Sequence, residues 1–300
     1  MDSRTIIIDN VDSITENYYK SKGIQSLLIW KNNHYSERKY KILRYFNLQH
    51  LCYGFTRKDI MSAKRIILCE PRNCCDVVEF IKKYNKNVQV VIWTWNIIDH
   101  DSINDIKKAK KRGLKIYSFD KDDCLKYGIE YNFNLLPVFK IKEFSEINGC
   151  FFCGKDKNRF STIEKLGQKI QEIGHEVNFI IVKDRHCKYP HESVTKLLNN
   201  NISYNDILDY ISKSKCLVDI VQEGQTGLTY RPLEALFYNK KLITNNKSII
   251  GYDFYNKSNI YILGEDGRTL QEFIESKFIP WDKKIVNSYT IKYWIKNFFA

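Results

Sequence analysis

The sequence lacks the segments that mark secreted, membrane-spanning and disordered proteins. Its first apolar run, Ile6–Ile8, is far shorter than the hydrophobic segment of a signal peptide. No stretch approaches the roughly 20 apolar residues of a transmembrane helix. Only five prolines occur in 300 residues, and no Pro/Gly/Ser-rich linker or internal repeat is present. We therefore expect a cytoplasmic protein whose domain boundaries are short and ordered.

The length and composition indicate a folded protein of two domains. Hydrophobic residues make up 43% of the chain and charged residues 28%, a balance typical of globular proteins. Three hundred residues exceed the usual size of one domain and fit two α/β domains of about 150 residues each.

The nine cysteines form no recognisable metal-binding or disulfide pattern. Cys150 and Cys153 have the spacing of half a structural zinc site, but the second half is missing. The nearby His186, Cys187 and His191 are irregularly spaced, and the segment CFFC also fits a buried strand. We expect reduced cysteines, no metal and no cofactor.

The net charge of +13 favours anionic partners such as phosphates, nucleic acid or an acidic membrane surface. A general bias of composition towards lysine is the alternative explanation. Because the basic residues are scattered, we do not expect nucleic acid as a partner. The tail, Tyr289–Ala300, mixes aromatic residues with lysines. It fits either a helix packed on the body of the protein or a contact with an anionic inner-membrane surface.

Short apolar runs alternate with segments of helical period along the whole chain, which predicts βα units and parallel sheets. The predicted strands are Thr5–Ile8, Ser26–Trp30, Arg65–Cys69, Val88–Trp93, Leu114–Ser118, Gly149–Gly154, Val177–Val182, Cys216–Val221, Lys241–Thr244 and Asn259–Leu263. The predicted helices are Glu37–Tyr45, Asp76–Tyr84, Ile103–Lys111, Lys121–Tyr127, Arg159–Ile173, Val194–Asn199, Tyr204–Lys213, Leu228–Tyr238, Thr269–Ser276 and a helix in the tail.

This order predicts two doubly wound, Rossmann-like α/β domains in tandem. In such sheets, ligands bind beyond the carboxyl ends of the strands. The rule selects four loops: Thr94–Asp101 in the first half, and Gly154–Arg159, Lys183–His191 and Gln222–Leu228 in the second.

The segment Gln225–Leu236 (QTGLTYRPLEAL) follows a buried strand and leads into a helix. Gly224 and Gly227 let the backbone approach a ligand closely, and the first N–H groups of the helix suit a diphosphate. Glu234 can accept two hydrogen bonds from a ribose, and Arg231 can face a phosphate or pair with a carboxylate. The alternative is an ordinary strand–glycine–helix turn.

A second loop, GKDKNR at Gly154–Arg159, gathers positive charge at another strand end. Gly154 permits a tight turn, and Lys155, Lys157 and Arg159 suit a sugar-diphosphate leaving group. The segment is not a Walker A loop, because the order G-x-x-x-x-G-K-[ST] is absent. A solvated basic turn is the alternative.

Together these segments resemble the GT-B glycosyltransferases of bacterial lipopolysaccharide-core, O-antigen or capsule biosynthesis. The resemblance rests on GKDKNR, on DIVQEGQTGLTYRPLEALFYNKKLITNN at Asp219–Asn246, on WTWN at Trp93–Asn96 and on YSFDKDDCLKYGIEY at Tyr117–Tyr131. It implies two domains facing a cleft, with the nucleotide-sugar on the C-terminal domain and the acceptor on the N-terminal domain. It also implies that Glu234 holds the ribose, that Lys157 and Arg159 neutralise the diphosphate, and that no metal is bound.

One departure from the pattern concerns the sugar contact. Many retaining GT-B enzymes carry two glutamates separated by seven residues, and here the first position is Thr226. Gln225 or Gln222 can take its place as a hydrogen-bonding group, so retention and inversion both stay open. The donor-binding residues expected are Gly154, Lys155, Lys157, Arg159, Gln225, Thr226, Gly227, Leu228, Thr229, Arg231 and Glu234.

An inverting reaction needs a base that takes the proton of the acceptor hydroxyl. The candidates are His100 and Asp99 in the loop after one strand, and Asp9 after another. The alternative is a capping role, with Asp99 or Asp101 as the N-cap of the helix Ile103–Lys111. On the same acceptor side we expect Trp95, as a stacking surface for a sugar, and Asn96.

These features predict transfer of a sugar from a nucleotide-sugar to a lipopolysaccharide, O-antigen or capsule glycan, or its lipid-linked precursor. The expected domains are 1–140 and 141–285, followed by a C-terminal helix at 286–300 for which crossing back to the N-terminal domain is one arrangement. A peripheral position on the inner face of the membrane accompanies the cytoplasmic assignment. The alternatives are a nucleotide-sugar epimerase of the same architecture and a non-catalytic basic protein that binds nucleic acid or anionic surfaces.

Overall fold

The computed structural model describes residues 4–10, 12–144, 147–222 and 225–300. It divides into two compact units, Met1–Phe133 with Trp294–Ala300, and Asn134–Tyr293. The first boundary lies before residue 140 because Asn134 and Phe139 already bond within the second unit. Asn134 Nδ2 donates to the Leu228 carbonyl at 3.5 Å, and the Phe139 N–H donates to the Tyr238 hydroxyl at 3.1 Å.

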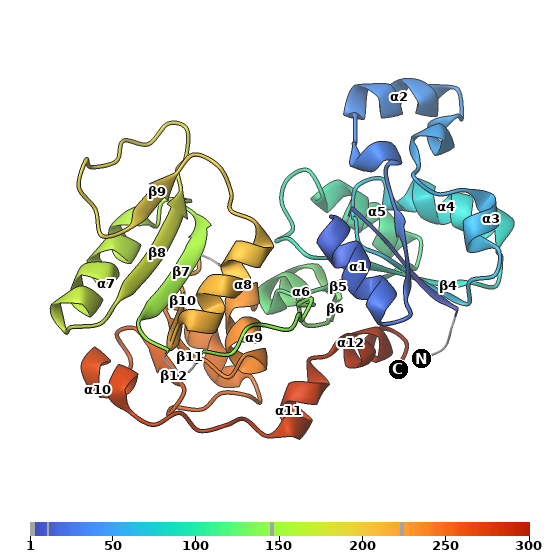
Figure 1. The fold of residues 1–300 in the computed structure, drawn as a ribbon. Helices are drawn as coiled ribbons and strands as arrows, with labels where there is room; N and C mark the ends of the chain where they lie inside the picture. The colour runs from blue at the N-terminus through green and yellow to red at the C-terminus, as the bar shows by residue number, and fades with distance from the viewer. Residues whose placement is uncertain (1–3, 11, 145–146, 223–224) are drawn as a thin grey trace. The chain divides into compact units, whose positions relative to one another are not determined.

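The first unit is built on a six-stranded parallel sheet in the order β2-β1-β3-β4-β5-β6 (Figure 1). Its strands are β1 (Thr5–Asp9), β2 (Gln25–Leu28), β3 (Arg65–Leu68), β4 (Gln89–Thr94), β5 (Lys115–Ser118) and β6 (Glu130–Tyr131). Its helices are α1 (Ser13–Ser21), α2 (Glu37–Tyr45), α3 (Arg57–Ile60), α4 (Cys74–Tyr84), α5 (Ile103–Lys111) and α6 (Lys121–Tyr127), with the short 3₁₀ turns η1 (Lys31–Asn33) and η2 (Gln49–Cys52).

Helices cover both faces of this sheet, as the alternation of strand side chains requires. On one face, Ile8, Leu68 and Ile92 share a core with residues of α4 and α5. The neighbouring residue Trp93 points to the opposite face. There it meets Trp294 of α12 (Ile291–Phe298) edge to face, with ring centroids 5.0 Å apart.

The last residues of the chain are therefore part of the first unit. Trp294 is fully buried, and its carbonyl accepts a hydrogen bond from Asn132 Nδ2 at 3.0 Å. Phe298 packs edge to face against Tyr117, and the Tyr117 hydroxyl donates to the Phe298 carbonyl at 3.2 Å. Of the two expectations for the tail, packing on the body of the protein is the one that the structure shows.

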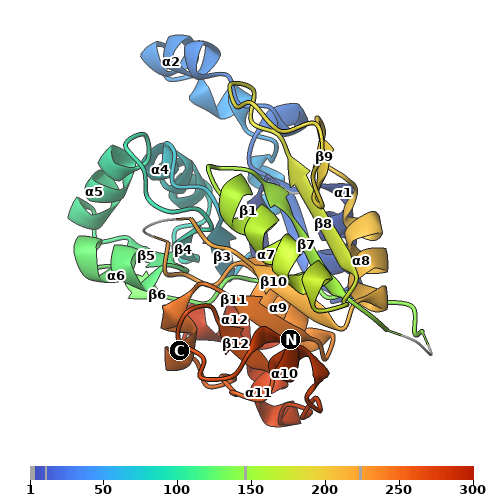
Figure 2. The same ribbon diagram turned by 90° about the vertical axis from the view of Figure 1, so that its left-hand side faces the viewer.

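The second unit contains another six-stranded parallel sheet, in the order β12-β11-β10-β7-β8-β9 (Figures 1 and 2). Its strands are β7 (Cys150–Lys155), β8 (Val177–Val182), β9 (Lys196–Leu198), β10 (Cys216–Asp219), β11 (Lys241–Thr244) and β12 (Ile260–Ile262). Its helices are α7 (Phe160–Glu172), α8 (Tyr204–Lys213), α9 (Tyr230–Phe237), α10 (Leu270–Glu275) and α11 (Lys283–Ser288), with the 3₁₀ turn η3 (Lys247–Gly251).

The same two-sided packing orders the second unit. Phe152 of β7 shares a core with α7 and α10. The adjacent Phe151 faces the other way and stacks on Tyr210 of α8, with centroids 5.1 Å apart. The predicted fold class of two doubly wound parallel α/β domains is confirmed, whereas the cleft between them stays a prediction.

One predicted element is wrong. Residues 194–199 do not form a helix, because Lys196–Leu198 is the strand β9, paired in parallel with β8. The carboxylate of Glu164 on α7 accepts the N–H groups of Val194 and Thr195, which fixes the extended entry to this strand. A short apolar segment fits a strand as well as a helix, and here the edge of β8 supplies the hydrogen-bond partners that make it a strand.

No helix in the described parts of the chain combines the length and the apolar character needed to cross a bilayer.

The packing of α12 leads to a stability prediction. Trp294→Ala should lower the free energy of unfolding by about 3–5 kcal/mol, because it leaves a cavity beside Trp93 and Phe298. Lys292→Ala, on the exposed side of the same helix, should change it by less than about 0.5 kcal/mol. Urea denaturation followed by circular dichroism compares the two variants, and equal stabilities would contradict the burial of Trp294.

Candidate functional site

The strand order of the second sheet reverses between β7 and β10, and ligands of doubly wound sheets bind at such a reversal. A pocket of about 480 Å³ lies at the carboxyl ends of these strands and of β11. That volume is within the range of small-molecule sites. Its lining residues are Asn158, Arg159, Thr162, Ile220, Val221, Gln222, Gln225, Thr226, Asn245, Asn246, Lys247 and Ser248. We call it the switch-point pocket.

A tight turn joins β7 to α7 at one wall of this pocket. Lys157 and Asn158 both have positive φ angles, 48° and 62°, and the Arg159 N–H closes the turn on the Asp156 carbonyl at 3.0 Å. The buried Asp156 carboxylate accepts the N–H groups of Arg159 and Phe160 at 2.9 and 2.7 Å. Asp156 therefore caps α7, so these two N–H groups are already occupied.

Arg159 ties the two strands of the reversal together. Its guanidinium donates to the Lys155 carbonyl at 2.5 Å, to the Asp156 carbonyl at 3.0 Å and to the Ile220 carbonyl beyond β10. Burial lowers the pKa of Arg159 from its ordinary value, against the opposing effect of nearby acids.

The other two cations of the predicted phosphate loop lie elsewhere. Lys155 and Lys157 are exposed and do not line the switch-point pocket. The pKa of Lys157 is lowered by partial desolvation and then by the charges of Arg159 and Lys155. Of the three cations expected at the pocket, the structure places only Arg159 there.

Two asparagines that sequence reasoning missed hold the opposite wall. Asn245 and Asn246 follow β11 directly. The Asn245 amide bonds both the N–H and the carbonyl of Val221, at 2.8 and 3.2 Å, and Asn246 Nδ2 donates to the Thr226 carbonyl at 3.3 Å. Their position one step after a predicted strand was the available signal, because the carboxyl end of β11 meets the same sheet edge.

The switch-point pocket is polar and cationic. Among its described lining residues, Arg159 and Lys247 carry positive charge, the remaining polar groups are amides and hydroxyls, and none is acidic. Lys247 Nζ also pairs with Glu265, an exposed contact that water screens strongly. Such a lining suits an anionic ligand that accepts and donates several hydrogen bonds.

Glu234 is not at this pocket, which corrects the expectation of a carboxylate open to a ribose. It is 1% exposed, and its two oxygens accept from Arg231 Nη1 at 2.5 Å and from the Tyr204 hydroxyl at 3.1 Å. Arg231 is turned inward with it, since Nη2 reaches the Cys153 carbonyl at 3.4 Å. The pairing of Arg231 with a carboxylate, one of its two predicted roles, is the one observed.

The remaining predicted donor-binding residues, 225–229, are likewise partly at the switch-point pocket and partly buried. Gln225 and Thr226 line the switch-point pocket, while Gly227 and Leu228 are buried. The Thr229 hydroxyl donates inward to Asp219 Oδ1 at 2.9 Å. Gly224, to which the sequence assigns close backbone approach, lies outside the described residues.

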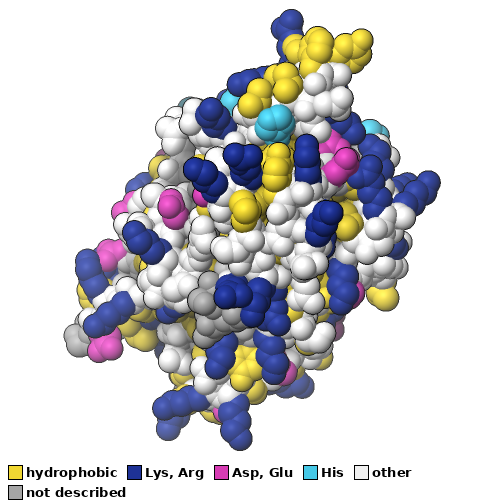
Figure 3. Space-filling model, turned by 90° about the vertical axis from the view of Figure 1, so that its right-hand side faces the viewer, with side chains coloured by type: hydrophobic (Ala, Val, Ile, Leu, Met, Phe, Trp, Pro, Cys, Tyr) yellow, Lys and Arg dark blue, Asp and Glu magenta, His cyan; other side chains and the backbone are white. Residues whose placement is uncertain are grey.

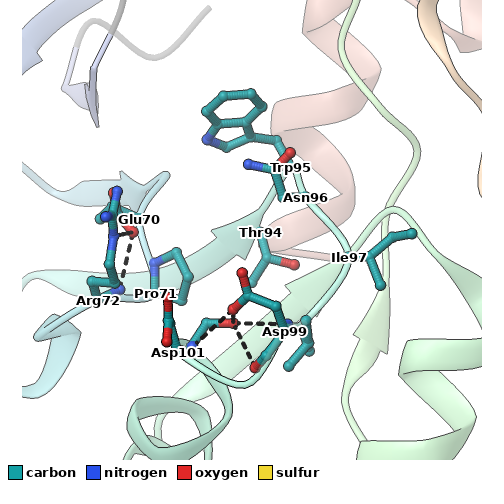
Figure 4. Close-up of a pocket in the computed structure, with 11 residues that line it drawn as sticks. Glu70, Pro71, Arg72, Thr94, Trp95, Asn96, Ile97, Asp99 and Asp101 are labelled. Carbon is teal, nitrogen blue, oxygen red and sulfur yellow. Dashed lines mark hydrogen bonds and ion pairs between the residues drawn. The ribbon is translucent and has the colours of Figure 1, made fainter. Parts of the chain in front are cut away.

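The first unit has its own pocket at the carboxyl ends of β3 and β4, with a volume of about 200 Å³ (Figure 4). Trp95 stands at its rim with 47% of its surface exposed, next to Asn96, so both residues predicted for the acceptor side line it. Glu70 and Arg72 on the facing wall belong to no motif that the sequence singles out. The buried Glu70 carboxylate binds the Arg72 guanidinium through two contacts, at 3.0 and 3.2 Å.

Two of the three predicted bases are poorly placed in this pocket. Asp99 lines it, but its carboxylate accepts the Ser102 N–H and hydroxyl at 3.0 and 2.8 Å. These bonds lower the pKa of Asp99, so its carboxylate is a weak base; it holds the turn before α5, whose N-cap is Ser102 rather than Asp99. His100 projects into solvent with a side chain 99% exposed and does not line the pocket.

Asp9, the third candidate, is buried and does not line this pocket either, but its surroundings shift its pKa towards that of a base. It ends β1, beside β3, where the strand order of the first sheet reverses. Burial and then the charge of Glu70 raise its pKa to about 7, although the Asn10 N–H, 2.7 Å from Oδ1, opposes the shift. A carboxyl that exchanges its proton near neutral pH is suited to general base catalysis.

Among the residues that the structure describes, one group of side chains has ligand atoms close enough for a metal ion. Asp156, Asp184 and Cys187 have ligand atoms within 4.8 Å of one another. The capping role of Asp156 explains its position without a metal, and its second oxygen accepts from the Tyr189 hydroxyl at 2.5 Å. Cys150 and Cys153, the pair with zinc-like spacing, lie on β7 and are not in this group.

No family model matches the chain, and no curated protein does. Among solved structures it is similar to the glycotransferase of kitacinnamycin, with a TM-score of 0.44 and 8% identity over 95% of this chain and 92% of that one. It is also similar to a glycosyltransferase from Rickettsia africae ESF-5, with a TM-score of 0.47 and 12% identity over 98% and 88% of the two chains. At these scores the likeness carries no argument about function.

The buried Arg231–Glu234 pair predicts a loss of stability on substitution. Glu234→Ala should lower the free energy of unfolding by about 3–5 kcal/mol, because it leaves the Arg231 charge buried and unpaired. Glu234→Gln keeps an oxygen for Arg231 and Tyr204 and should cost less. Chemical denaturation of both variants measures the difference. An alanine variant as stable as the wild type would show that Glu234 has no structural role.

The raised pKa of Asp9 predicts a dependence of stability on pH. Between about pH 4 and pH 7 the folded state holds a proton on Asp9 that the unfolded state has lost. The free energy of unfolding therefore falls as pH rises across this range and levels off above about pH 7. From pH 5 to pH 8 the wild type should lose about 2–3 kcal/mol more than Asp9→Asn. Asp99→Asn is the control, because the lowered pKa of Asp99 leaves it ionised throughout this range. Parallel curves for wild type and Asp9→Asn would refute the assignment.

Proposed function

We propose that the protein is a glycosyltransferase that moves a sugar from a nucleotide-sugar to a glycan acceptor of lipopolysaccharide, O-antigen or capsule biosynthesis. The observation that carries the proposal is the switch-point pocket. It combines the position expected for a nucleotide with a lining that is cationic and free of described acidic residues. The acceptor class rests on the sequence resemblance alone.

The switch-point pocket fits the donor diphosphate in charge. Lys247 is exposed enough to move onto a phosphate, and Arg159 adds positive charge held in place by carbonyl groups. As the bond to the sugar breaks, negative charge grows on the leaving diphosphate, and fixed cations stabilise it. The amides of Gln222, Gln225 and Asn245 provide hydrogen bonds for base, ribose or sugar hydroxyls.

The pocket of the first unit fits the acceptor. A sugar ring presents an apolar face that stacks on an exposed indole, and its hydroxyls bond carboxylates and amides, so Trp95 and Asn96 suit that ligand. In an inverting reaction, Asp9 takes the proton of the attacking hydroxyl. Activity should then rise as pH increases through about 7, because only the deprotonated carboxylate can accept the proton.

A thermal-shift series tests the donor site. UDP-, GDP- and dTDP-sugars, which carry a diphosphate, are compared with CMP-sugars, which carry one phosphate, since only ligands of the native state raise the melting temperature. At least one diphosphate donor should raise it. Lys247→Ala should weaken that binding about tenfold, the effect of losing one charge-assisted hydrogen bond. Lys165→Ala, on the exposed side of α7, should bind like the wild type.

Incubation with the bound donor alone then separates the enzyme classes. Slow hydrolysis of the donor indicates a transferase without its acceptor, whereas an altered sugar on the nucleotide indicates an epimerase. If no diphosphate donor raises the melting temperature and none is consumed, the proposed function is refuted.

A further inference from the structure

The α2 segment of the first unit exposes an unusual concentration of apolar surface. Five large hydrophobic side chains within ten residues have relative exposures of 42% to 83%. They are Ile42, Tyr45, Phe46, Leu48 and Leu51. We call this set the α2 patch. Single exposed apolar residues are ordinary, but contiguous patches mark interaction surfaces.

The orientation of α2 is fixed by its opposite side. Tyr40 is buried against Trp30, and its hydroxyl donates to Asp76 Oδ2 at 2.9 Å. One turn further, Arg44 Nε pairs with the same carboxylate at 2.9 Å. Because these contacts hold one side of the helix on α4, Ile42, Tyr45 and Phe46, at positions i, i+3 and i+4, share the outward side.

Positive charge surrounds the α2 patch. Residues 36–61 contain six cations and two acids. The cations are Arg38, Lys39, Lys41, Arg44, Arg57 and Lys58, all exposed. Two of them are ion-paired, Lys41 with Glu37 at 2.6 Å and Arg44 with Asp76 on the inner side of α2. Figure 3 shows yellow hydrophobic side chains at the top of this face, with dark blue Lys and Arg side chains below them. In Figure 1, α2 projects above the sheet of the first unit, so the patch is not covered by the rest of that unit.

We propose that the α2 patch docks the protein on an anionic lipid bilayer, with its aromatic and aliphatic side chains in the interfacial region. Aromatic rings prefer this depth, aliphatic side chains enter the acyl boundary, and flanking lysines and arginines bind anionic headgroups. The net positive charge of the segment favours such a surface over a neutral apolar partner. The site is distinct from the tail, whose aromatic residues Trp294 and Phe298 are buried.

Vesicle flotation of the full-length protein tests the proposal independently of any transferase activity. The protein should float with phosphatidylcholine–phosphatidylglycerol vesicles, bind pure phosphatidylcholine vesicles weakly and release at high salt. Tyr45→Ser combined with Phe46→Ser should reduce binding at least about tenfold. Lys39→Gln combined with Lys41→Gln should reduce binding to anionic vesicles only.

Leu125→Ser is the matched control, because Leu125 is 84% exposed on α6 beside Lys126, and the described residues 120–130 contain no second large exposed hydrophobic side chain. It should float like the wild type, and unchanged melting temperatures should show that all variants fold. Failure of the wild type to bind anionic vesicles would overturn the proposal. So would binding that the Tyr45 and Phe46 substitutions leave intact, or concentration-dependent dimerisation that they abolish in the absence of lipid.

Discussion

The contact on which the switch-point pocket depends is the bond of the Arg159 guanidinium to the carbonyl groups of two neighbouring strands. At the reversal of strand order, helices leave the sheet on opposite faces, so the strand ends β7 and β10 have no crossover connection to hold them together. Arg159 supplies that link through Lys155 and Ile220. Its desolvation is offset by charge-assisted hydrogen bonds, which are stronger than neutral ones.

These bonds of Arg159 determine how each cation of the switch-point pocket can interact with a ligand. An arginine already bonded to three carbonyl groups acts on a ligand mainly through its fixed charge, while Lys247 retains the freedom to form a new direct contact. Asp156 also limits direct contacts with a ligand, because its carboxylate accepts the N–H groups at the start of α7, which would otherwise attract a phosphate. The pocket is thus built from a rigid charged wall and a mobile cation.

Periodicity predicted the elements well and the directions of individual side chains poorly. The helices α5 and α8 have the predicted bounds, because a helical pattern sustained over nine or ten residues fixes which side chains are buried. The helix prediction for residues 194–199 was wrong because a short apolar segment fits a strand as well as a helix. Only the pairing with the edge of β8 decides between the two. The predicted role of Glu234 was wrong because α9 is buried on several sides. Its neighbours Pro232, Leu233, Ala235 and Leu236 are all buried, so the sequence pattern does not indicate which way the carboxylate points. The position of Asn245 and Asn246 after a predicted strand was visible in the sequence, but that this strand, β11, lies beside β10 was not.

The two pockets differ in charge in a way that the net charge of +13 does not reveal. The pocket of the first unit is lined by Glu70, Asp99 and Asp101 with a single arginine, whereas the described lining of the switch-point pocket holds two cations and no acid. A diphosphate is repelled by the first lining and attracted by the second, while a neutral sugar can hydrogen-bond to either. The excess of positive charge on the whole chain raises the local concentration of every anion, including a bilayer surface, but does not discriminate among them. Discrimination must therefore come from the linings themselves, through the carboxylates of the first unit as well as the cations of the second.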